Sequence, residues 1–455
     1  MHLMNNSFTG TFQLPNFNHY KLAELEISSN NITGQLPKEF GLVLSNLQYI
    51  GMSRNSFHGN VPSSIGEVKG LLYMDLSNNN FSGMLPGSML GNGTDLSCLY
   101  LSNNNFSGMT SVDSLNINVH LSVLDISNNY YQNSLSGSIP HVLSRSPNFV
   151  VLDLRDNKFT GNIPSWINQL SKLRVLSLGG NALRGHIPNQ LCQLRIVSIM
   201  DLSHNLLFGS IPSCFNNFSI LKNMSFGNMG AYNFGSESVG PPKFFNPDHP
   251  LYNATLEFEA TDSLLHGSSS RTIQVEFEMK YRYDSYKGDI IKQVAGIDLS
   301  CNELTGSIPP EIGDLHEIRS LNLSHNHLSG FIPISFSNLK SLESLDLANN
   351  NLSGEIPSQL VELNFLEIFD VSNNNLSGKI LDKGQFGTFD ESSYRGNPGL
   401  CGPIINKSCN TDEVPPPPSN DKEEEKEDEG GVDMVWFYWS FSASYVTILL
   451  GDGRA

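Results

Sequence analysis

A ten-residue phrase recurs along this chain at an almost fixed interval, and it constrains the fold more than any other feature. It reads SHNLLFGSIP at 203–212 and SHNHLSGFIP at 324–333. One asparagine marks every copy, and these residues are Asn6, Asn30, Asn55, Asn79, Asn104, Asn129, Asn157, Asn181, Asn205, Asn302, Asn326, Asn350 and Asn374. The spacing is 24 or 25 residues, except for 28 before Asn157 and 97 before Asn302. A repeat of this period predicts a solenoid, in which each repeat packs only on its neighbours.

The residues of one copy explain how a coil forms. In LESLDLANNNLSGEIP, at 342–357, Leu345 and Leu347 alternate with outward residues, which predicts a short strand with one buried face. The amide of Asn350 can satisfy backbone groups that the following turn would bury. Pro357 then opens a return with 3₁₀ or short helical turns. We therefore expect an α/β-type leucine-rich-repeat solenoid, a right-handed superhelix with a parallel sheet on its concave face.

The breaks in the repeat divide the chain. We expect leucine-rich repeats over 1–222, the first one partial, an island insertion over 223–293 and four more repeats over 294–380. A C-terminal cap over 381–410 and a Pro-rich, acidic juxtamembrane linker over 411–433 follow. Within the island, Ile273, Val275, Phe277 and Met279 alternate with polar residues, which predicts a strand. A long insertion with a strand of its own indicates a folded excursion.

The last segment, 434–455, begins with aromatic residues and stays uncharged over 435–450. We interpret it as the truncated start of a transmembrane helix, with Trp436, Tyr438 and Trp439 at the interface. Its sixteen uncharged positions are fewer than the roughly 20 that span a bilayer, so an apolar tail is the alternative. At the other end the chain opens in mid-repeat without a signal peptide, which predicts truncation there too.

The six cysteines favour two disulfides. Cys401 and Cys409 follow the last repeat closely, and Cys192 and Cys214 occupy nearly equivalent convex positions of adjacent coils. We expect Cys98 and Cys301 to be free. Besides Asn5, the glycosylation sequons Asn-x-Ser/Thr begin at Asn31, Asn80, Asn92, Asn105, Asn217, Asn223, Asn253, Asn322, Asn351, Asn375 and Asn406. An Asn- and Ser-rich repeat produces some sequons by chance, but with paired cysteines they favour a secreted or cell-surface chain.

Enzymatic and nucleic-acid functions find little support. His316 and Glu317 begin a metalloprotease-like phrase, but Ser320 stands where a second histidine is required. No phosphate-binding glycine loop and no kinase triplet occurs, so we expect no catalysis and no cofactor. The net charge of −18 argues against nucleic acid as a partner. Aspartates recur in mid-strand, and we interpret them as a solvated polar stripe: Asp75, Asp125, Asp153, Asp201, Asp298, Asp346 and Asp370.

Binding is expected on the concave face. Tyrosine and arginine are common interface anchors. Outward strand positions supply the ligand-binding candidates Tyr49, Arg54, Tyr73, Tyr100, Arg155 and Arg174. The three tyrosines come from successive coils and could form one ridge. The alternative is that any long concave sheet exposes some aromatic side chains.

Several motifs together resemble a known family. The LxGxIP endings, GIDLSCNELTGSIP after the island, GNPGLCG in the cap, the acidic run and FYWSFSASYVTILL look like a plant leucine-rich-repeat receptor-like protein. The resemblance implies a receptor at the plasma membrane that faces outward, lacks a kinase domain and acts in immune or developmental signalling. It also implies an extracellular peptide, glycan or protein ligand.

The same resemblance implies two kinds of partner kinase. A co-receptor kinase would dock on the island and the last repeats, and an adaptor kinase would pair through the membrane helix. Lys280 and Tyr286 match the family's motif of a lysine, five residues and a tyrosine, which is implicated in co-receptor contact. The alternative for this pair is a local cation–π contact.

Two other hypotheses stay open from the sequence. One is a secreted apoplastic binder or enzyme-inhibitor-like repeat protein, and the other is a non-functional gene fragment. A secreted inhibitor would stop after the cap at Cys401–Cys409, whereas this chain continues into an acidic linker and an aromatic apolar segment.

Overall fold

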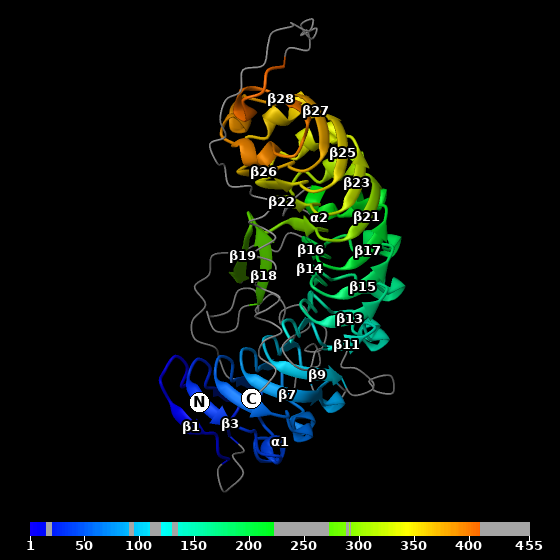
Figure 1. The fold of residues 1–455 in the computed structure, drawn as a ribbon. Coiled ribbons are helices and arrows are strands. Elements are labelled where there is room, and N and C mark those ends of the chain that lie inside the picture. Colours follow the sequence, from blue (N-terminus) through cyan, green and yellow to red (C-terminus); the bar gives the residue numbers. More distant parts are fainter. Residues whose placement is uncertain are drawn as a thin grey trace, which may run out of the picture. The chain divides into compact units, whose positions relative to one another are not determined.

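The computed structural model describes residues 1–14, 21–90, 95–109, 120–129, 135–222, 273–287, 291 and 293–409. Within them, short strands of successive coils pair in parallel into one sheet (Figure 1). Its strands, in order, are β2 Glu24–Glu26, β4 Tyr49–Gly51, β6 Tyr73–Asp75, β8 Cys98–Tyr100, β10 Val123–Asp125, β12 Val151–Asp153, β14 Val175–Ser177, β16 Ile199–Asp201, β20 Gly296–Asp298, β22 Ser320–Asn322, β24 Ser344–Asp346 and β26 Ile368–Asp370. We call this the concave sheet.

A second set of strands follows each turn and forms two further parallel sheets in the described residues. One contains β1 Thr9–Thr11, β3 Asn31–Gly34, β5 Ser56–Gly59, β7 Asn80–Leu85 and β9 Asn105–Met109. The other contains β11 Ser136–Gly137, β13 Lys158–Gly161, β15 Ala182–Gly185, β17 Leu206–Gly209, β21 Glu303–Ser307, β23 His327–Gly330, β25 Asn351–Glu355, β27 Asn375–Lys379 and β28 Gly399–Cys401.

The convex returns are mostly 3₁₀ turns that start after the proline of each phrase. They are η1 Ser63–Glu67, η2 Gly87–Met89, η3 His141–Arg145, η4 Ser165–Gln169, η5 Asn189–Gln193, η6 Ser213–Asn217, η8 Pro310–Asp314, η9 Ile334–Asn338 and η10 Ser358–Glu362. Two short α-helices are α1 Phe40–Val43 and α2 Ser219–Lys222, and the cap holds η11 Gly384–Gly387, η12 Glu391–Tyr394 and η13 Pro403–Ile405. The predicted leucine-rich-repeat solenoid with 3₁₀ turns is confirmed.

Each anchor asparagine holds two coils together. The Nδ2 of Asn326 donates to the carbonyl oxygens of Leu299, Leu323 and Ser324 at 3.0–3.2 Å. Its Oδ1 accepts the backbone N–H of Leu304 at 3.0 Å. Asn326 is only 5% exposed. The amide thus satisfies four backbone groups that the turn would otherwise bury without partners.

The turn before each anchor has a feature that the repeat phrase did not reveal. The preceding residue adopts positive φ, for example 53° at Arg54 and 53° at His325. One turn later Gly354 has a φ of 77°, and a Cβ there would lie 2.5 Å from the Phe331 ring. Glycine is favoured at this position for its backbone conformation, whereas the exposed Phe331 ring could move aside.

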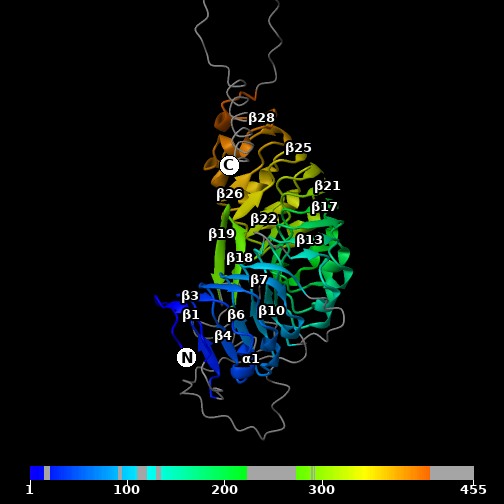
Figure 2. The same cartoon turned by 60° about the horizontal axis from the view of Figure 1, so that its bottom comes forward.

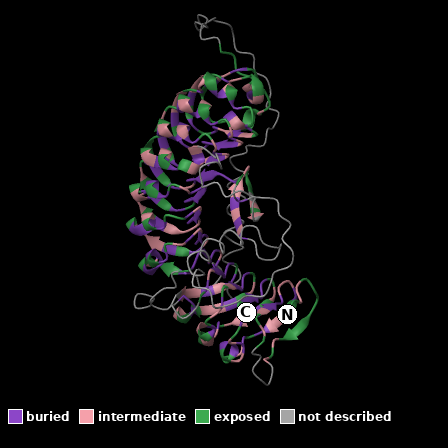
Figure 3. Ribbon diagram, turned by 180° about the vertical axis from the view of Figure 1, so that it is seen from behind, coloured by how far each residue is buried: buried purple, intermediate pink, exposed green. Residues whose placement is uncertain are grey.

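Stacking of the coils creates one continuous apolar core. Leucines, isoleucines and phenylalanines from every described coil are buried, as Figure 3 shows by the purple inner faces of the coils. Phe57, Phe81 and Phe106 stack in a row, with ring centroids 5.8 and 6.5 Å apart. No coil could bury these rings alone, so each repeat depends on its neighbours.

The long insertion leaves the register of the solenoid intact. Strand β16 pairs directly with β20, and Met200 lies opposite Ile297. The Nδ2 of Asn302 donates to the carbonyl of Leu202 at 3.0 Å, so the asparagine ladder also continues. The coils on the two sides of the insertion are therefore direct neighbours.

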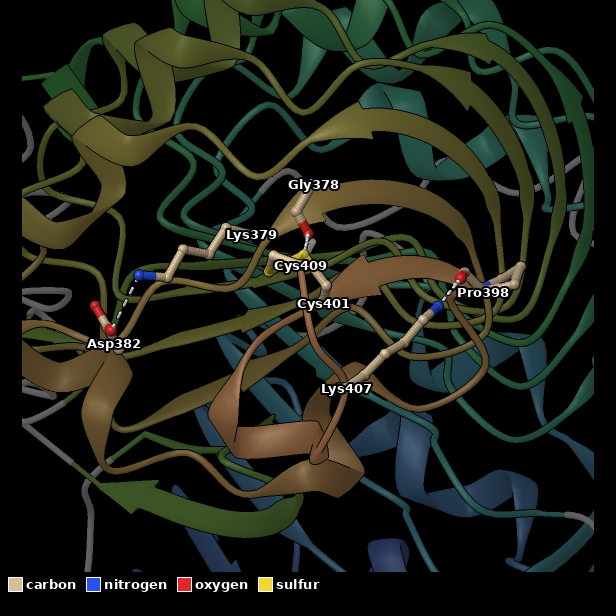
Figure 4. The surroundings of a disulfide bond; sticks show 7 residues. All are labelled: Gly378, Lys379, Asp382, Pro398, Cys401, Lys407 and Cys409. Carbon is tan, nitrogen blue, oxygen red and sulfur yellow. Dashed lines mark hydrogen bonds and ion pairs between the residues drawn. A yellow bond between two sulfur atoms is a disulfide. The ribbon is translucent and has the colours of Figure 1, made fainter. Parts of the chain in front are cut away.

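The structure contains the two predicted disulfides. Cys192 joins Cys214 across η5 and η6 with a Cα–Cα distance of 5.7 Å, and Cys401 joins Cys409 with 5.0 Å. Cys98 and Cys301 are free, as expected. Figure 4 shows the second disulfide beside β27, where Sγ of Cys401 lies 3.5 Å from the carbonyl of Gly378.

The cap proves to be a modified coil. Strand β28 extends the sheet of β27. Asn397 takes the anchor role, because its Oδ1 accepts the N–H of Leu376 and its Nδ2 donates to Val371 and Tyr394. The sequence placed the last anchor one coil earlier, at Asn374.

Part of the expected organisation lies outside the described residues. The linker at 411–433, the apolar segment at 434–455 and most of the island fall there. Among the residues that the structure does describe, no helix is both long and apolar enough to cross a membrane.

Candidate ligand-binding groove and docked hairpin

The island contributes a β-hairpin to the described structure. Strand β18 Gln274–Met279 pairs antiparallel with β19 Arg282–Lys287. The alternation of the sequence predicts β18 correctly, whereas it gave no sign of β19. Lys280 and Tyr281 form the turn with φ values of 57° and 60°. Such values are costly for bulky residues and persist only where surrounding contacts hold them.

The hairpin packs on the concave sheet (Figure 1; Figure 2). The first residue of successive strands forms an apolar column, Cys98, Val123, Val151, Val175 and Ile199. Ile273, Val275 and Phe277 of the hairpin cover this column and are at most 3% exposed. A Cβ on Gly296 would come within 2.3 Å of the Phe277 ring, so the small residue there admits the ring. The hairpin thus buries apolar positions that a bare solenoid would expose.

The third residue of the same strands forms a second column, which is mostly acidic. The structure corrects the expectation of a solvated stripe, because Asp153, Asp201 and Asp298 are only 2–3% exposed. Most of these carboxylates accept the backbone N–H two residues further on, as Asp298 does from Ser300 at 2.9 Å. The aspartates of this acidic column are therefore turn caps, and the hairpin lies over part of them.

Arg155 lies two residues after Asp153 and forms an ion pair with the acidic column. Its guanidinium contacts Asp153 at 2.9 Å and Glu276 of the hairpin at 3.5 Å. Arg155 is 4% exposed, so the expectation that its side chain points into solvent is wrong. Burial alone would lower the pKa of Arg155, but the adjacent Asp153 raises it. The residue holds the hairpin to the sheet.

The crowded carboxylates make stability depend on pH. Burial raises the pKa of Asp298 to about 8, and Asp201 adds to the rise. An unfolded aspartate has a pKa of about 3.9, so between these values the folded state holds a proton that the unfolded state releases. Stability therefore falls as pH rises from about 4 to about 8. We expect Asp298→Asn to stabilise the chain at pH 8, on the order of 1–2 kcal/mol, and to change little at pH 4.

The measurement is thermal unfolding of parent and variant at both pH values. Asn322 occupies the next position of the column and accepts the N–H of Ser324 at 3.1 Å, so an amide fits there. Asp314→Asn on the convex side is the control, with no expected gain at pH 8. An Asp298→Asn effect of the same size at pH 4 and pH 8 would contradict the ionisation argument.

The hairpin tip is fixed to the last repeats. The Nζ of Lys280 lies 2.8 Å from Glu343 and 2.8 Å from Glu367. The Tyr281 hydroxyl donates to Asp370 at 3.3 Å. Burial would lower the pKa of Lys280, but the two glutamates raise it. Together with Arg155 and Glu276, these contacts fasten the hairpin at both ends.

The predicted partner-binding pair therefore has internal contacts in this structure. Lys280 is engaged by two glutamates, and Tyr286 is half-buried against the apolar column. The neighbouring Tyr281 is 54% exposed, and the Arg282 side chain is 72% exposed. Sequence reasoning missed Tyr281 and Arg282, because the turn that presents them was not predicted.

A polar groove of about 220 Å³ runs over the N-terminal half of the concave sheet. Tyr49, Arg54, Tyr73, Tyr100 and Arg155 all line it, and Gln274 and Glu276 of the hairpin close one side. Arg174, which lies just before β14, does not line it. The predicted tyrosine ridge exists, with ring centroids 4.5 Å apart for Tyr49–Tyr73 and 5.6 Å apart for Tyr73–Tyr100. Tyr49 and Tyr100 are, however, largely buried.

The described sequons lie at several positions of the repeat. The asparagine after an anchor opens strands β3, β7, β25 and β27 and is exposed at Asn31, Asn80, Asn351 and Asn375. Asn5, Asn217 and Asn406 are exposed elsewhere, and Asn105 is half-buried. Asn322 is poorly placed for glycosylation, because its amide lies in the acidic column and forms hydrogen bonds with Asp298 and Ser324. Asn92, Asn223 and Asn253 lie outside the described residues.

Comparison with known proteins agrees with this architecture. One leucine-rich-repeat family model matches residues 147–207, and a second matches 21–42, 70–92, 295–315, 317–339 and 341–363. In Arabidopsis thaliana, putative receptor-like protein 8 is 56% identical over 239 residues, which are 51% of this chain and 23% of that protein. Receptor-like protein 1 is 66% identical over 180 residues, 39% of this chain and 17% of that protein. These matches support a plant leucine-rich-repeat receptor-like protein.

This receptor-like protein spans less than a quarter of the length of those two relatives. Its fold matches the GASSHO1/SCHENGEN3 ectodomain of Arabidopsis thaliana, solved with CASPARIAN STRIP INTEGRITY FACTOR 2, with a TM-score of 0.58. That match has 24% identity and covers 90% of this chain and 45% of the other. The PEPR1–AtPEP1 structure matches with a TM-score of 0.56 at 23% identity, over 87% and 50% of the two chains.

Proposed function

We propose that this chain is the ligand-recognition ectodomain of a cell-surface receptor that signals through partner receptor kinases and performs no catalysis itself. The observation that carries the proposal is the groove on the concave sheet, closed on one side by the docked hairpin. An immune or developmental role at the plasma membrane is consistent with relatives that are named receptor-like proteins.

The ligand surface is proposed to be the groove over the N-terminal repeats. Tyr73 provides half-buried aromatic area packed between the largely buried Tyr49 and Tyr100, and Arg54 lies at the exposed edge. Solved structures with this fold include the PEPR1–AtPEP1 structure, and one that is described as the plant peptide hormone receptor RGFR1 in complex with RGF2. An extracellular peptide, or a protein that presents a peptide segment, is the ligand class that these neighbours favour.

The partner surface is proposed to be the hairpin tip with the last repeats. Lys280 fixes the tip through Glu343 and Glu367, and Tyr281 and Arg282 are exposed beside it. Tyr286 supports the hairpin from the opposite strand, where it faces Val275. In this proposal a co-receptor kinase contacts the tip, and Lys280 and Tyr286 hold the tip in the required position.

Co-precipitation of the secreted chain with a co-receptor kinase ectodomain, in the presence of extracellular plant fluid, tests the proposal. We expect Lys280→Ala and Tyr286→Ala each to reduce recovery about fivefold to tenfold, equivalent to roughly 1–1.4 kcal/mol. Glu343→Gln with Glu367→Gln separates two mechanisms. It should reduce recovery equally if Lys280 positions the tip, and should leave recovery intact if Lys280 contacts the partner directly.

The control is Lys340→Ala, which removes an exposed ion pair with Glu362 in which no hairpin residue takes part. Recovery of this variant should equal that of the parent. Unchanged recovery of both Lys280→Ala and Tyr286→Ala would refute the partner surface.

A further inference from the structure

Acids outnumber cations where the hairpin contacts the concave sheet. The acidic column contributes five aspartates to this contact, namely Asp153, Asp201, Asp298, Asp346 and Asp370. Strand β18 adds Glu276 and Glu278. Among the described residues, the cations here are Arg155, Lys280 and Arg319. The hairpin therefore brings negative charge to a surface that is already acidic.

The register of the sheet places two of these carboxylates side by side. Asp201 on β16 lies directly opposite Asp298 on β20, so their backbones are one strand spacing, or about 4.8 Å, apart. Within the described part of the chain, neither of them forms an ion pair. Two ionised carboxylates this close repel each other, so a pair that is shielded from water retains a proton.

The hairpin provides the shielding. Asp75 and Asp370, towards the two ends of the acidic column, are half-buried, whereas Asp201 and Asp298 are 3% and 2% exposed. Phe277 packs on β20 two residues before Asp298, where a Cβ on Gly296 would lie 2.3 Å from the ring. Burial, then Asp201 and then Glu278 raise the pKa of Asp298 to about 8. Departure of the hairpin would return this pair to water and lower that pKa.

Ion pairs hold the hairpin on the acidic side of the pH range. Arg155 contacts Glu276 at 3.5 Å, and Lys280 contacts Glu343 and Glu367 at 2.8 Å each. Burial would raise the pKa of Glu343, but hydrogen bonds from Lys280 and Arg319 lower it. Glutamate in general loses its charge only near pH 4.3. These attachments therefore remain in mildly acidic solution.

The other titratable groups at the contact keep one charge state between pH 5 and pH 8. Burial raises the pKa of Tyr281, Tyr286 and Cys301 above their ordinary values, so all three stay neutral. Arg282 pairs with Asp284 of its own strand at 2.9 Å. Aspartates of the acidic column, by contrast, titrate in this range, since burial also raises the pKa of Asp346 to about 6.

The sign of the effect follows from the covered pair. While the hairpin is docked, Asp298 holds a proton that a hydrated aspartate releases near pH 3.9. A pKa that is higher in the docked state favours docking at low pH, and this preference is lost as pH rises towards about 8. One proton of this kind changes the docking equilibrium by up to about tenfold per pH unit.

We propose that the hairpin is a pH-dependent strap, docked on the concave sheet in mildly acidic solution and released as the pH rises through neutrality. Release uncovers the apolar column at Val151, Val175 and Ile199. It also opens the side of the groove that Gln274 and Glu276 close. The strap requires no particular ligand or partner, so this inference goes beyond the proposed receptor function.

Hydrogen exchange of the full chain at pH 6 and pH 8, read by mass spectrometry and corrected for the intrinsic exchange rate, tests the strap. An isolated two-stranded hairpin is marginally stable, so its amides exchange once it leaves the sheet. We expect protection over 273–287 to fall at least about tenfold from pH 6 to pH 8. Protection of β23 and β25, which belong to a different sheet, should stay unchanged.

Asp298→Asn provides the decisive variant. Asn322 occupies the next position of the acidic column, so an amide fits there. Because this side chain cannot ionise, the hairpin of the variant should be protected at pH 8 at least about tenfold better than that of the parent. Asp314→Asn, on the convex turn η8, should lose hairpin protection as the parent does.

Three results would overturn the strap. The first is equal hairpin protection at pH 6 and pH 8 in the parent chain. The second is an equal loss of protection in β23 and β25, which would show that the repeats unfold together with the hairpin. The third is an undiminished loss in Asp298→Asn, which would remove the covered carboxylate pair as its cause.

Discussion

A chain with Arg155→Met should be less stable than the parent by roughly 3–5 kcal/mol. The guanidinium is almost fully buried and contacts both Asp153 and Glu276. Its removal leaves Asp153 as an uncompensated buried charge in the acidic column. Chemical denaturation monitored by circular dichroism measures the loss. Hydrogen exchange over 273–287 should also increase, because the hairpin loses the ion pair between Arg155 and Glu276.

The double variant Arg155→Met with Asp153→Asn separates charge from packing. It removes both members of the pair, so most of the lost stability should return. Lys340→Met, which breaks an exposed ion pair with Glu362, should cost less than about 1 kcal/mol. A double variant as unstable as the single one would show that Arg155 acts by filling space rather than by charge.

The second large effect is expected in the asparagine ladder. Asn326→Ala should destabilise the chain by on the order of 4 kcal/mol, because three buried carbonyls and one buried N–H lose their partner at about 1–3 kcal/mol each before relaxation. Denaturant unfolding gives the free-energy difference.

Asn338→Ala provides the matched comparison, since this asparagine is exposed on η9 of the following convex return. It should change stability by no more than about 0.5 kcal/mol. A loss below about 1 kcal/mol for Asn326→Ala would mean that solvent replaces the amide, and that the apolar core alone holds the coils in register.

The regular part of this fold is readable from the sequence because its forces are local or between nearest neighbours. The interval between anchors indicates which residues stack, and Asn326 meets the same partners in its coil as Asn350 does in the next. The disulfides follow for the same reason. Cys192 and Cys214 are close because their coils are adjacent.

The site was harder to predict because it depends on contacts between distant residues. The alternation at 273–279 predicts a strand with an apolar face, yet nothing local indicates that Val275 and Phe277 cover Val151 and Val175. Without that cover, outward strand positions are expected to face solvent. This one missing contact explains both errors, the solvated acidic stripe and the outward Arg155.

The tyrosine ridge was predicted correctly in its position but not in its burial. The positions of Tyr49, Tyr73 and Tyr100 follow from the repeat, and their rings do form a row. Their burial does not follow from it, because it results from the curved stack of coils and the adjacent hairpin.

The uninterrupted register across the insertion has a consequence for how this fold can vary. The exit and re-entry points are both bonded to one coil, since Leu221 accepts from Glu317 and Ala295 accepts from Arg319. The coils before and after the insertion therefore pair directly, with no further coil between them. The coils on either side are therefore neighbours in register whatever the length of the chain between them.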